Sequence, residues 1–205
     1  MVSTRVAVPL GALMVAGAGL RLWALSDQPF DFHTDRQLYD VLMSRAFWVD
    51  LGGTPPGGTT DAILAARPET IEPPVTQLGA ALLYRLTGGE SVWLVRAVLA
   101  LVWVAAAVPL WRTVTRLTGR QAAGVLAAAS WVLTPFGVVA SRSFQPDGLT
   151  LVCGVLSIAA MVRYDETPAR RSWWSAALWA SAAAFVKVTA VFVVVPVPAR
   201  WPMPR

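Results

Sequence analysis

The run VWLVRAVLALVWVAAAVPLW at residues 92–111 decides the class of this fold. Arg96 is its only charged residue, and about 20 apolar residues in a row are enough to cross a bilayer as one helix. The rest of the 205-residue chain has the same character, with 56% hydrophobic and 14% charged residues. These proportions favour an integral membrane protein over a domain with a water-soluble core.

Four further apolar segments predict an all-α membrane protein with about five transmembrane helices. The first segment has a rival interpretation as a signal peptide, because Arg5 precedes it. Against cleavage, no small-x-small site follows the segment, and Arg21 interrupts its end. The fourth segment is short for a complete span. With 92–111 as the second, the segments lie at about residues 6–25, 122–140, 149–162 and 173–197.

The basic residues are spread over helix ends and connections, so the formal net charge of +5 does not indicate a nucleic-acid partner. Cytoplasmic loops of membrane proteins collect Arg and Lys. Arginine-rich connections follow the second and fourth segments, at residues 112–120 and 163–171. Both lie in the cytoplasm if the N-terminus does, and the loop at 26–91 then lies outside it. Arg200 and Arg205 do not fit this pattern.

The loop at 26–91 holds nine of the twelve acidic residues, and its sequence predicts two helices. Polar residues recur at Arg36, Asp40 and Ser44 among apolar ones, which predicts an interfacial helix over about 36–50. Prolines before and glycines after residues 74–87 predict a second helix. At ~13 residues it would be about 20 Å long, too short to span, so we expect it in the interface as well. The GGTPPGGTT stretch between them (52–60) has the composition of a loop.

Titratable residues gather in PFDFHTDRQLYD, residues 29–40, where the chain leaves the first segment. Asp31, His33 and Asp35 alternate, so they share a side if the backbone is extended. One aspartate could act as a general base on a hydroxyl acceptor, or the three residues could hold a divalent metal. In the alternative interpretation this is a solvated loop in which Thr34 or Asp35 caps the following helix.

Four cations are expected at similar depth on the same face as this acidic loop. Lys187 lies about 21 Å along the fifth segment if that segment is helical, and a charge inside a span is costly. Such cations could hold the phosphate of a lipid-linked substrate, or could extend to the headgroups instead. Asp147, in the turn SRSFQPDG (141–148), could serve a site or cap the fourth segment. The other three cations are Arg21, Arg96 and Arg142.

Motifs along the chain resemble bacterial membrane glycosyltransferases of the C-type fold, which include protein O-mannosyltransferases and lipid A aminoarabinose transferases. The resemblance covers nearly the whole chain. In order, the motifs are FHTDRQ, EPPVTQLGAALLYRLTG, WLVRAVLAL, RSFQPDGL and AAFVKVTAVF.

The resemblance implies transfer of a sugar from a polyprenyl-phosphate donor outside the cytoplasm, in a bacterial inner membrane. It makes Asp35 the first candidate for the catalytic base and Asp31 the second. His33, Arg36 and Gln37 would line the same site, and Lys187, Arg142 and Arg96 would meet the lipid phosphate. The remaining substrate-binding candidates are Glu72, Arg96, Arg142, Asp147 and Lys187.

The chain differs from this family in length, because such enzymes usually carry more spans. Residues 1–205 would form one membrane module, and the ending PVPARWPMPR resembles neither a span nor a tail. We therefore expect truncation, with a partner subunit supplying missing helices or with the remnant inactive. A fragment of a non-enzymatic transporter is the alternative from another functional class.

Overall fold

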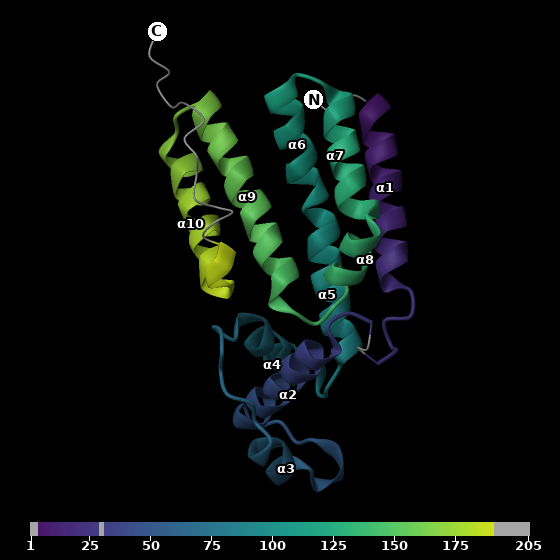
Figure 1. Cartoon of the computed structure of the whole chain (residues 1–205), viewed down its shortest axis with the longest axis vertical. Helices are drawn as coiled ribbons and strands as arrows, with labels where there is room; N and C mark the ends of the chain where they lie inside the picture. Colours follow the sequence, from purple (N-terminus) through teal and green to yellow (C-terminus); the bar gives the residue numbers. More distant parts are fainter. Residues whose placement is uncertain (1–3, 29–30, 191–205) are drawn as a thin grey trace.

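Helices make up all the regular structure in the described part of the chain, residues 4–28 and 31–190 of the computed structural model. The all-α prediction is confirmed. Figure 1 shows a bundle of long helices and, below one end of it, a smaller helical unit. The small unit contains α2 (Thr34–Asp50), α3 (Thr60–Ala65) and α4 (Val75–Thr87). The bundle contains α1 (Thr4–Leu22), α5 (Val92–Ala105), α6 (Ala107–Thr118), α7 (Gln121–Leu133), α8 (Pro135–Ser141), α9 (Pro146–Glu166) and α10 (Arg170–Val186).

Two helices of the described part are long and apolar enough to cross a membrane. One is the continuous α5–α6 helix, Val92–Thr118, and the other is α9. At 27 residues the first is about 40 Å long. The bent pair α7–α8 gives a third span if it is counted as one, and Val8–Leu22 is a shorter apolar helix. The chain is a multi-pass membrane protein.

The third span is broken by Pro135, where α7 and α8 meet at 57°. Proline has no backbone N–H and disfavours helical geometry at the residue before it. Thr134 accordingly has ψ of 127°, and α8 starts afresh at Pro135. The sequence predicts one segment over 122–140, without this bend.

The two helices expected at 36–50 and 74–87 are present as α2 and α4. Between them, α3 was not predicted, because its first residue belongs to a stretch with the composition of a loop. The expectation that a helix continues through Lys187 is wrong. α10 ends at Val186, and Lys187 has an extended backbone. The expected residues 191–197 of the fifth segment lie outside the described part.

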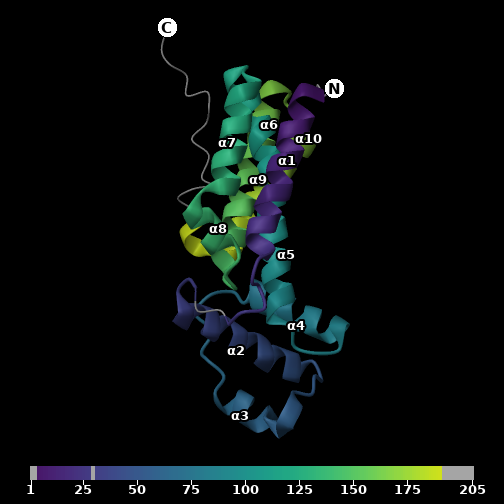
Figure 2. The ribbon, with the colours of Figure 1, turned by 90° about the vertical axis from the view of Figure 1, so that its right-hand side faces the viewer.

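The small unit packs on the bundle through its own apolar core. Val41 and Trp48 of α2 meet Tyr84 of α4, Val95 of α5 and Phe144 of the α8–α9 connection. Figure 2 shows α2 crossing beneath the ends of the bundle helices. Two residues of the expected polar stripe of α2, Asp40 and Ser44, are fully buried instead of facing water, and the third, Arg36, is partly exposed. The helix is therefore anchored by packing against protein.

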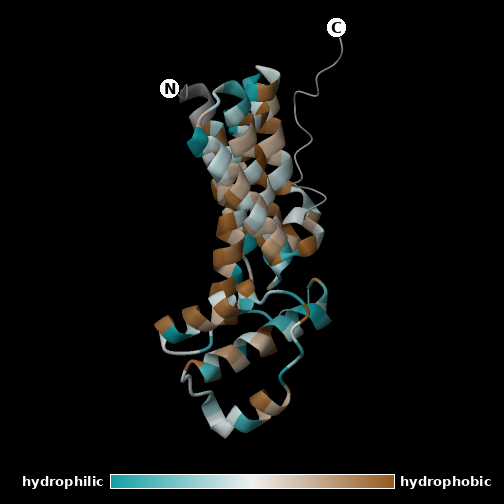
Figure 3. Ribbon diagram, turned by 90° about the vertical axis from the view of Figure 1, so that its left-hand side faces the viewer, coloured by the Kyte–Doolittle hydropathy of each residue, from teal (hydrophilic) through white to brown (hydrophobic). Residues whose placement is uncertain are grey.

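Hydrophilic residues concentrate at the ends of the bundle and in the loops of the small unit (Figure 3). On α4, the apolar residues Leu78, Leu82 and Leu86 are exposed at i, i+4 and i+8, on one side of the helix. That stripe suits the interfacial position expected for α4.

Candidate active site

A cavity of about 400 Å³ lies where the start of α2 meets α8, α9 and the residues after α10. Its walls combine aromatic side chains with titratable ones. Phe32, Trp103 and Phe136 supply the aromatic surface. The titratable residues are His33, Arg36, Glu72, Asp147 and Lys187. Five of the ten site residues expected from sequence thus meet around one space.

Two ion pairs occupy the cavity wall. Arg36 Nη2 lies 2.5 Å from Glu72 Oε2, and Lys187 Nζ lies 2.6 Å from Asp147 Oδ1. All four side chains are partly exposed, so a ligand in the cavity can reach them. A cation paired with a carboxylate can exchange that partner for a phosphate, because both anions accept charge-assisted hydrogen bonds. The cavity therefore suits a phosphate-containing ligand.

Asp31 is held by two arginines outside the cavity wall. Its Oδ2 accepts a hydrogen bond from Arg96 Nη2 at 3.0 Å, and Arg142 Nε lies 3.4 Å away. Arg96 is only 1% exposed and also donates to the backbone carbonyls of Leu25, Asp27 and Arg142. The sequence suggested that Arg96 and Arg142 meet a phosphate. In the structure they join the residues after α1 to the start of α5 and to the end of α8.

Gln37 is also fully buried and does not line the cavity, and it bonds to backbone groups and to the Asp31 carboxylate. Its Nε2 donates to the Phe32 carbonyl at 2.7 Å, and its Oε1 accepts from the Phe144 N–H at 2.8 Å. Gln145 Nε2 donates to the Phe32 carbonyl too, at 3.2 Å. These bonds fix the turn in which His33 has a positive φ of 45°. His33 is the N-cap of α2, so the expected capping by Thr34 or Asp35 is wrong.

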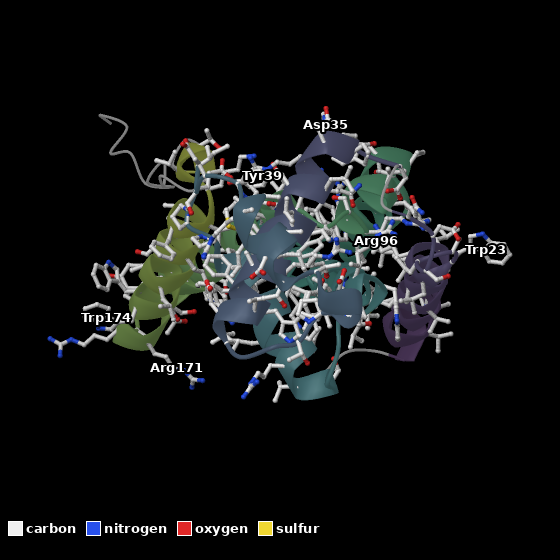
Figure 4. All side chains as sticks on the ribbon, turned by 90° about the horizontal axis from the view of Figure 1, so that it is seen from below. Trp23, Asp35, Tyr39, Arg96, Arg171 and Trp174 are labelled. Atoms are coloured by element: carbon white, nitrogen blue, oxygen red, sulfur yellow. The ribbon has the colours of Figure 1, made fainter. Side chains whose placement is uncertain are left out.

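Asp35 lies at the exposed edge of the site. It stands in the first turn of α2, between Thr34 and Arg36, and Figure 4 shows it pointing away from the protein. The same view places Arg96 in the interior. Among the described residues, Asp35 has no ion-pair or hydrogen-bond partner for its carboxylate. Its neighbours His33 and Arg36 line the cavity, whereas Asp35 does not.

A family model described as dolichyl-phosphate-mannose-protein mannosyltransferase matches residues 71–199, more than half of the chain. The chain belongs to this family. Neither the comparison with curated proteins nor the one with solved structures gave a match. The match includes Glu72, Asp147 and Lys187 of the cavity and begins after Asp35. The protein is therefore a membrane glycosyltransferase of the C-type fold.

Behind Arg36 of the cavity wall lies a buried carboxylate, Asp40, that the sequence interpretation did not count among the site residues. Asp40 accepts a hydrogen bond from Gln77 Nε2 at 2.5 Å, and its Oδ2 lies 3.7 Å from Arg36 Nε. Burial raises the pKa of Asp40 to about 6, although Gln77 and Arg36 both oppose that rise. Helical spacing could have revealed it, because Asp40 lies one turn after Arg36 on the face that carries Gln37 and Val41.

The cavity of this mannosyltransferase-family protein does not suit a metal ion by its donor set. Within the described residues, no group of three His, Cys, Asp or Glu side chains could hold one. Glu72 and Asp147 each face a cation instead of each other. A divalent metal on Asp31, His33 and Asp35, which the sequence suggested, is not supported by this arrangement.

Proposed function

We propose that the protein transfers a sugar from a polyprenyl-phosphate-linked donor to a hydroxyl acceptor beside the small unit. The observation that carries this proposal is the cavity with Arg36 and Lys187 in its wall. It lies where the bundle meets the small unit, which is where a headgroup at the membrane surface would sit. Both cations can donate charge-assisted hydrogen bonds to a lipid phosphate. Membership of the mannosyltransferase family supports the same donor class.

Asp35 is the carboxylate best suited to act as general base. A base must be free to accept a proton from an acceptor that approaches from water. Asp31 is held by Arg96 and Arg142, while Glu72 and Asp147 are paired with the cavity cations. Asp35 is exposed at the rim with an unpaired carboxylate among the described contacts. Asp35 differs from the other exposed acids of the small unit because it lies between His33 and Arg36, which line the cavity, and it is also the residue that the family resemblance suggested.

The reaction would be a direct displacement at the anomeric carbon. Asp35 takes the proton of the acceptor hydroxyl, whose oxygen forms the new bond to that carbon. The bond from the carbon to the phosphate oxygen breaks, and polyprenyl phosphate leaves. Lys187 and Arg36 stabilise the charge that develops on the leaving phosphate.

The arginine distribution supports an extracytoplasmic site. The α6–α7 and α9–α10 connections lie at the end opposite the small unit (Figure 1). These connections and the helix turns beside them carry Arg112, Arg116, Arg120, Arg163, Arg170 and Arg171. Arg116 and Glu166 lie 3.5 Å apart across those two connections. Because arginine-rich loops stay in the cytoplasm, the small unit would lie on the extracytoplasmic face of a plasma membrane.

Incorporation of labelled mannose from polyprenyl-phosphate mannose into membrane acceptors tests this function. We expect Asp35→Asn to lower transfer roughly 10²- to 10⁴-fold, the usual contribution of a general base, with donor binding unchanged. Asp61→Asn is the matched control, since Asp61 is also exposed in the first turn of a helix of the small unit. Full transfer by Asp35→Asn would rule out Asp35 as the base. If the unaltered protein neither binds the donor nor transfers the sugar, the proposed function is ruled out. Solute flux in vesicles without transfer would favour a transporter.

A further inference from the structure

Arg21 is a fully buried cation that the proposed reaction does not use. The sequence suggested that it faces a phosphate or extends to the headgroups, but it contacts neither the cavity nor solvent. Its Nη1 donates to the carbonyls of Gly17 at 3.0 Å and Val132 at 2.7 Å, and its Nε donates to Ser141 Oγ at 2.6 Å. Within the described part of the chain, no carboxylate pairs with it. A buried charge without a counterion is costly in a membrane and requires a reason.

Arg21 replaces a backbone hydrogen-bond donor that the break in the third span removes. In an unbroken helix, the carbonyls of Trp131 and Val132 would accept from the N–H groups of residues 135 and 136. Pro135 has no N–H, and the bend displaces the next one. Two side chains from other helices replace them. Trp103 Nε1 donates to the Trp131 carbonyl at 3.1 Å, and Arg21 donates to the Val132 carbonyl.

Arg21 also reaches the far end of α8. Ser141, which accepts from its Nε, is the last residue of that helix. One guanidinium therefore joins the last turn of α7 to the end of α8 and sets the relative orientation of the two helices. Carbonyls without a hydrogen-bond partner are costly in a membrane, so the bend is stable only while these hydrogen-bond donors are present.

The orientation of α8 shapes the cavity. α8 contributes Phe136 and Ala140 to the wall, and the Phe136 ring packs edge-on against Phe32 at 5.6 Å between centroids. If α8 continued in the direction of α7, neither residue would keep its place in the wall. The bend is thus a structural requirement for the cavity. The side chains that donate hydrogen bonds to its free carbonyls come from α1 and α5.

We propose that Arg21 is a positioning residue, which fixes the α7–α8 bend and thereby the wall of the donor cavity. Trp103 assists it on the neighbouring carbonyl. The link to catalysis rests on the proposed function, whereas the link to the bend does not. Two separate measurements therefore test the two links.

The bend is tested by a distance measurement between nitroxide labels at residues 122 and 139, with Cys153 replaced by Ser. A straight helix would separate these backbone positions by roughly 26 Å, and the bend shortens that separation. We expect Arg21→Met to lengthen and broaden the distance distribution and Arg112→Met, which removes an exposed arginine, to leave it unchanged. An unchanged distribution in Arg21→Met would overturn the proposal. If Arg21→Met does not fold, Ser141→Ala removes one of the three acceptors, and the same comparison applies to that variant.

The catalytic link is tested by kinetics with polyprenyl-phosphate mannose on the full chain with its native cysteine. We expect Arg21→Met to raise the KM for the donor roughly tenfold or more, with a smaller change in kcat, because the donor wall is misplaced while the base is intact. Arg21→Lys should restore part of the KM, since an ammonium can still donate to the Val132 carbonyl. A change in distance with an unchanged KM would separate the bend from the cavity and overturn the catalytic link alone.

Discussion

Lys187 and Asp147 form an ion pair with 2.6 Å between Nζ and Oδ1, joining the end of α10 to the start of α9. The pair exists because α10 stops at Val186, which leaves Lys187 on extended backbone beside the first turn of α9. A negative charge in that first turn also interacts favourably with the helix dipole. Asp147 therefore competes with any anionic ligand for Lys187.

This competition predicts opposite effects of changing the two partners. Lys187→Gln should weaken binding of polyprenyl-phosphate mannose roughly 10- to 100-fold, the range for a lost charged hydrogen bond. Asp147→Asn should strengthen binding, because the ammonium no longer has a carboxylate partner. Donor titrations of the purified variants measure both changes, with Arg112→Gln as the control for removal of an exposed cation. Weaker binding in Asp147→Asn would show that the carboxylate contacts the donor itself.

Asp40 predicts a pH dependence of stability. Its pKa in the folded protein is about 6, above the ordinary value of 3.8, so folding favours the protonated form. The free energy of unfolding is then highest below about pH 4 and falls as the pH rises through about 6, by on the order of 3 kcal/mol from this group. Asp40→Asn should flatten that dependence and raise the thermal midpoint at pH 8.

Thermal unfolding in detergent micelles between pH 4 and 8 measures this effect. The groups that face Asp40 are Gln77 of α4, Arg36 of its own helix, and the acids Glu72 and Asp147. Asn keeps a carbonyl oxygen for the hydrogen bond from Gln77. Asp61→Asn, on the exposed side of the small unit, should leave the profile unchanged. A profile of Asp40→Asn that matches the unaltered protein would contradict the prediction.

The contacts of Gln37 predict that a substitution of equal size, Gln37→Glu, makes stability depend on pH. Gln37→Glu places a carboxylate close to the Phe32 carbonyl and to Asp31 Oδ1, which now lies 3.2 Å from the amide nitrogen. The variant should be more destabilised at pH 8 than at pH 5, because only its protonated form avoids this repulsion. Gln37→Met should cost about 1–3 kcal/mol at either pH, by leaving buried backbone groups unpaired. Gln121→Glu, at an exposed helix start, is the control, and equal stability of Gln37→Glu at the two pH values would refute the explanation.

The close contact at Gly124 predicts that the packing of α6 against α7 does not tolerate a larger side chain. A Cβ at this position would lie 2.6 Å from the Trp111 carbonyl oxygen, and it would also clash with Thr115. Because one of the atoms is backbone, Gly124→Ala should destabilise the bundle by roughly 1–3 kcal/mol. Gly79 lies on the exposed side of α4, where an added Cβ meets no atom within 4 Å, so Gly79→Ala should raise stability by up to ~1 kcal/mol. Chemical unfolding of the two variants compares them, and equal stability would mean that α6 and α7 pack less closely.

Local pattern predicted the helices well, and it located the site region. The run at 92–111 predicted a span that the structure extends to Thr118, and the two helices of the loop were expected within two residues of α2 and α4. Such features depend on neighbours in sequence, because apolar runs and proline or glycine positions act within a few turns. The aspartates near the exit of α1 were likewise visible as a cluster.

The partners of the charged residues could not be read in the same way. Nothing near Arg96 in the sequence indicates that it holds Asp31, 65 residues away, or that Arg21 bonds to Val132 and Ser141. Each of these pairs depends on which helices are neighbours and how deeply they are buried. The sequence treated Arg21, Arg96, Arg142 and Lys187 as one group of cations at similar depth. In the structure only Lys187 of these four lines the cavity, and the three arginines bond to other parts of the fold.

The sequence by itself determined an all-α membrane protein, the helices of its loop and the place where its titratable residues gather. The tertiary structure decided which carboxylates are free, that Asp40 is buried, that the third span is bent and that Lys187 leaves its helix. The physical reason is that hydrophobicity and helix propensity are properties of short stretches. The ionisation and pairing of a side chain instead depend on the solvent it loses and the partners it meets, and these are set only when distant helices pack together.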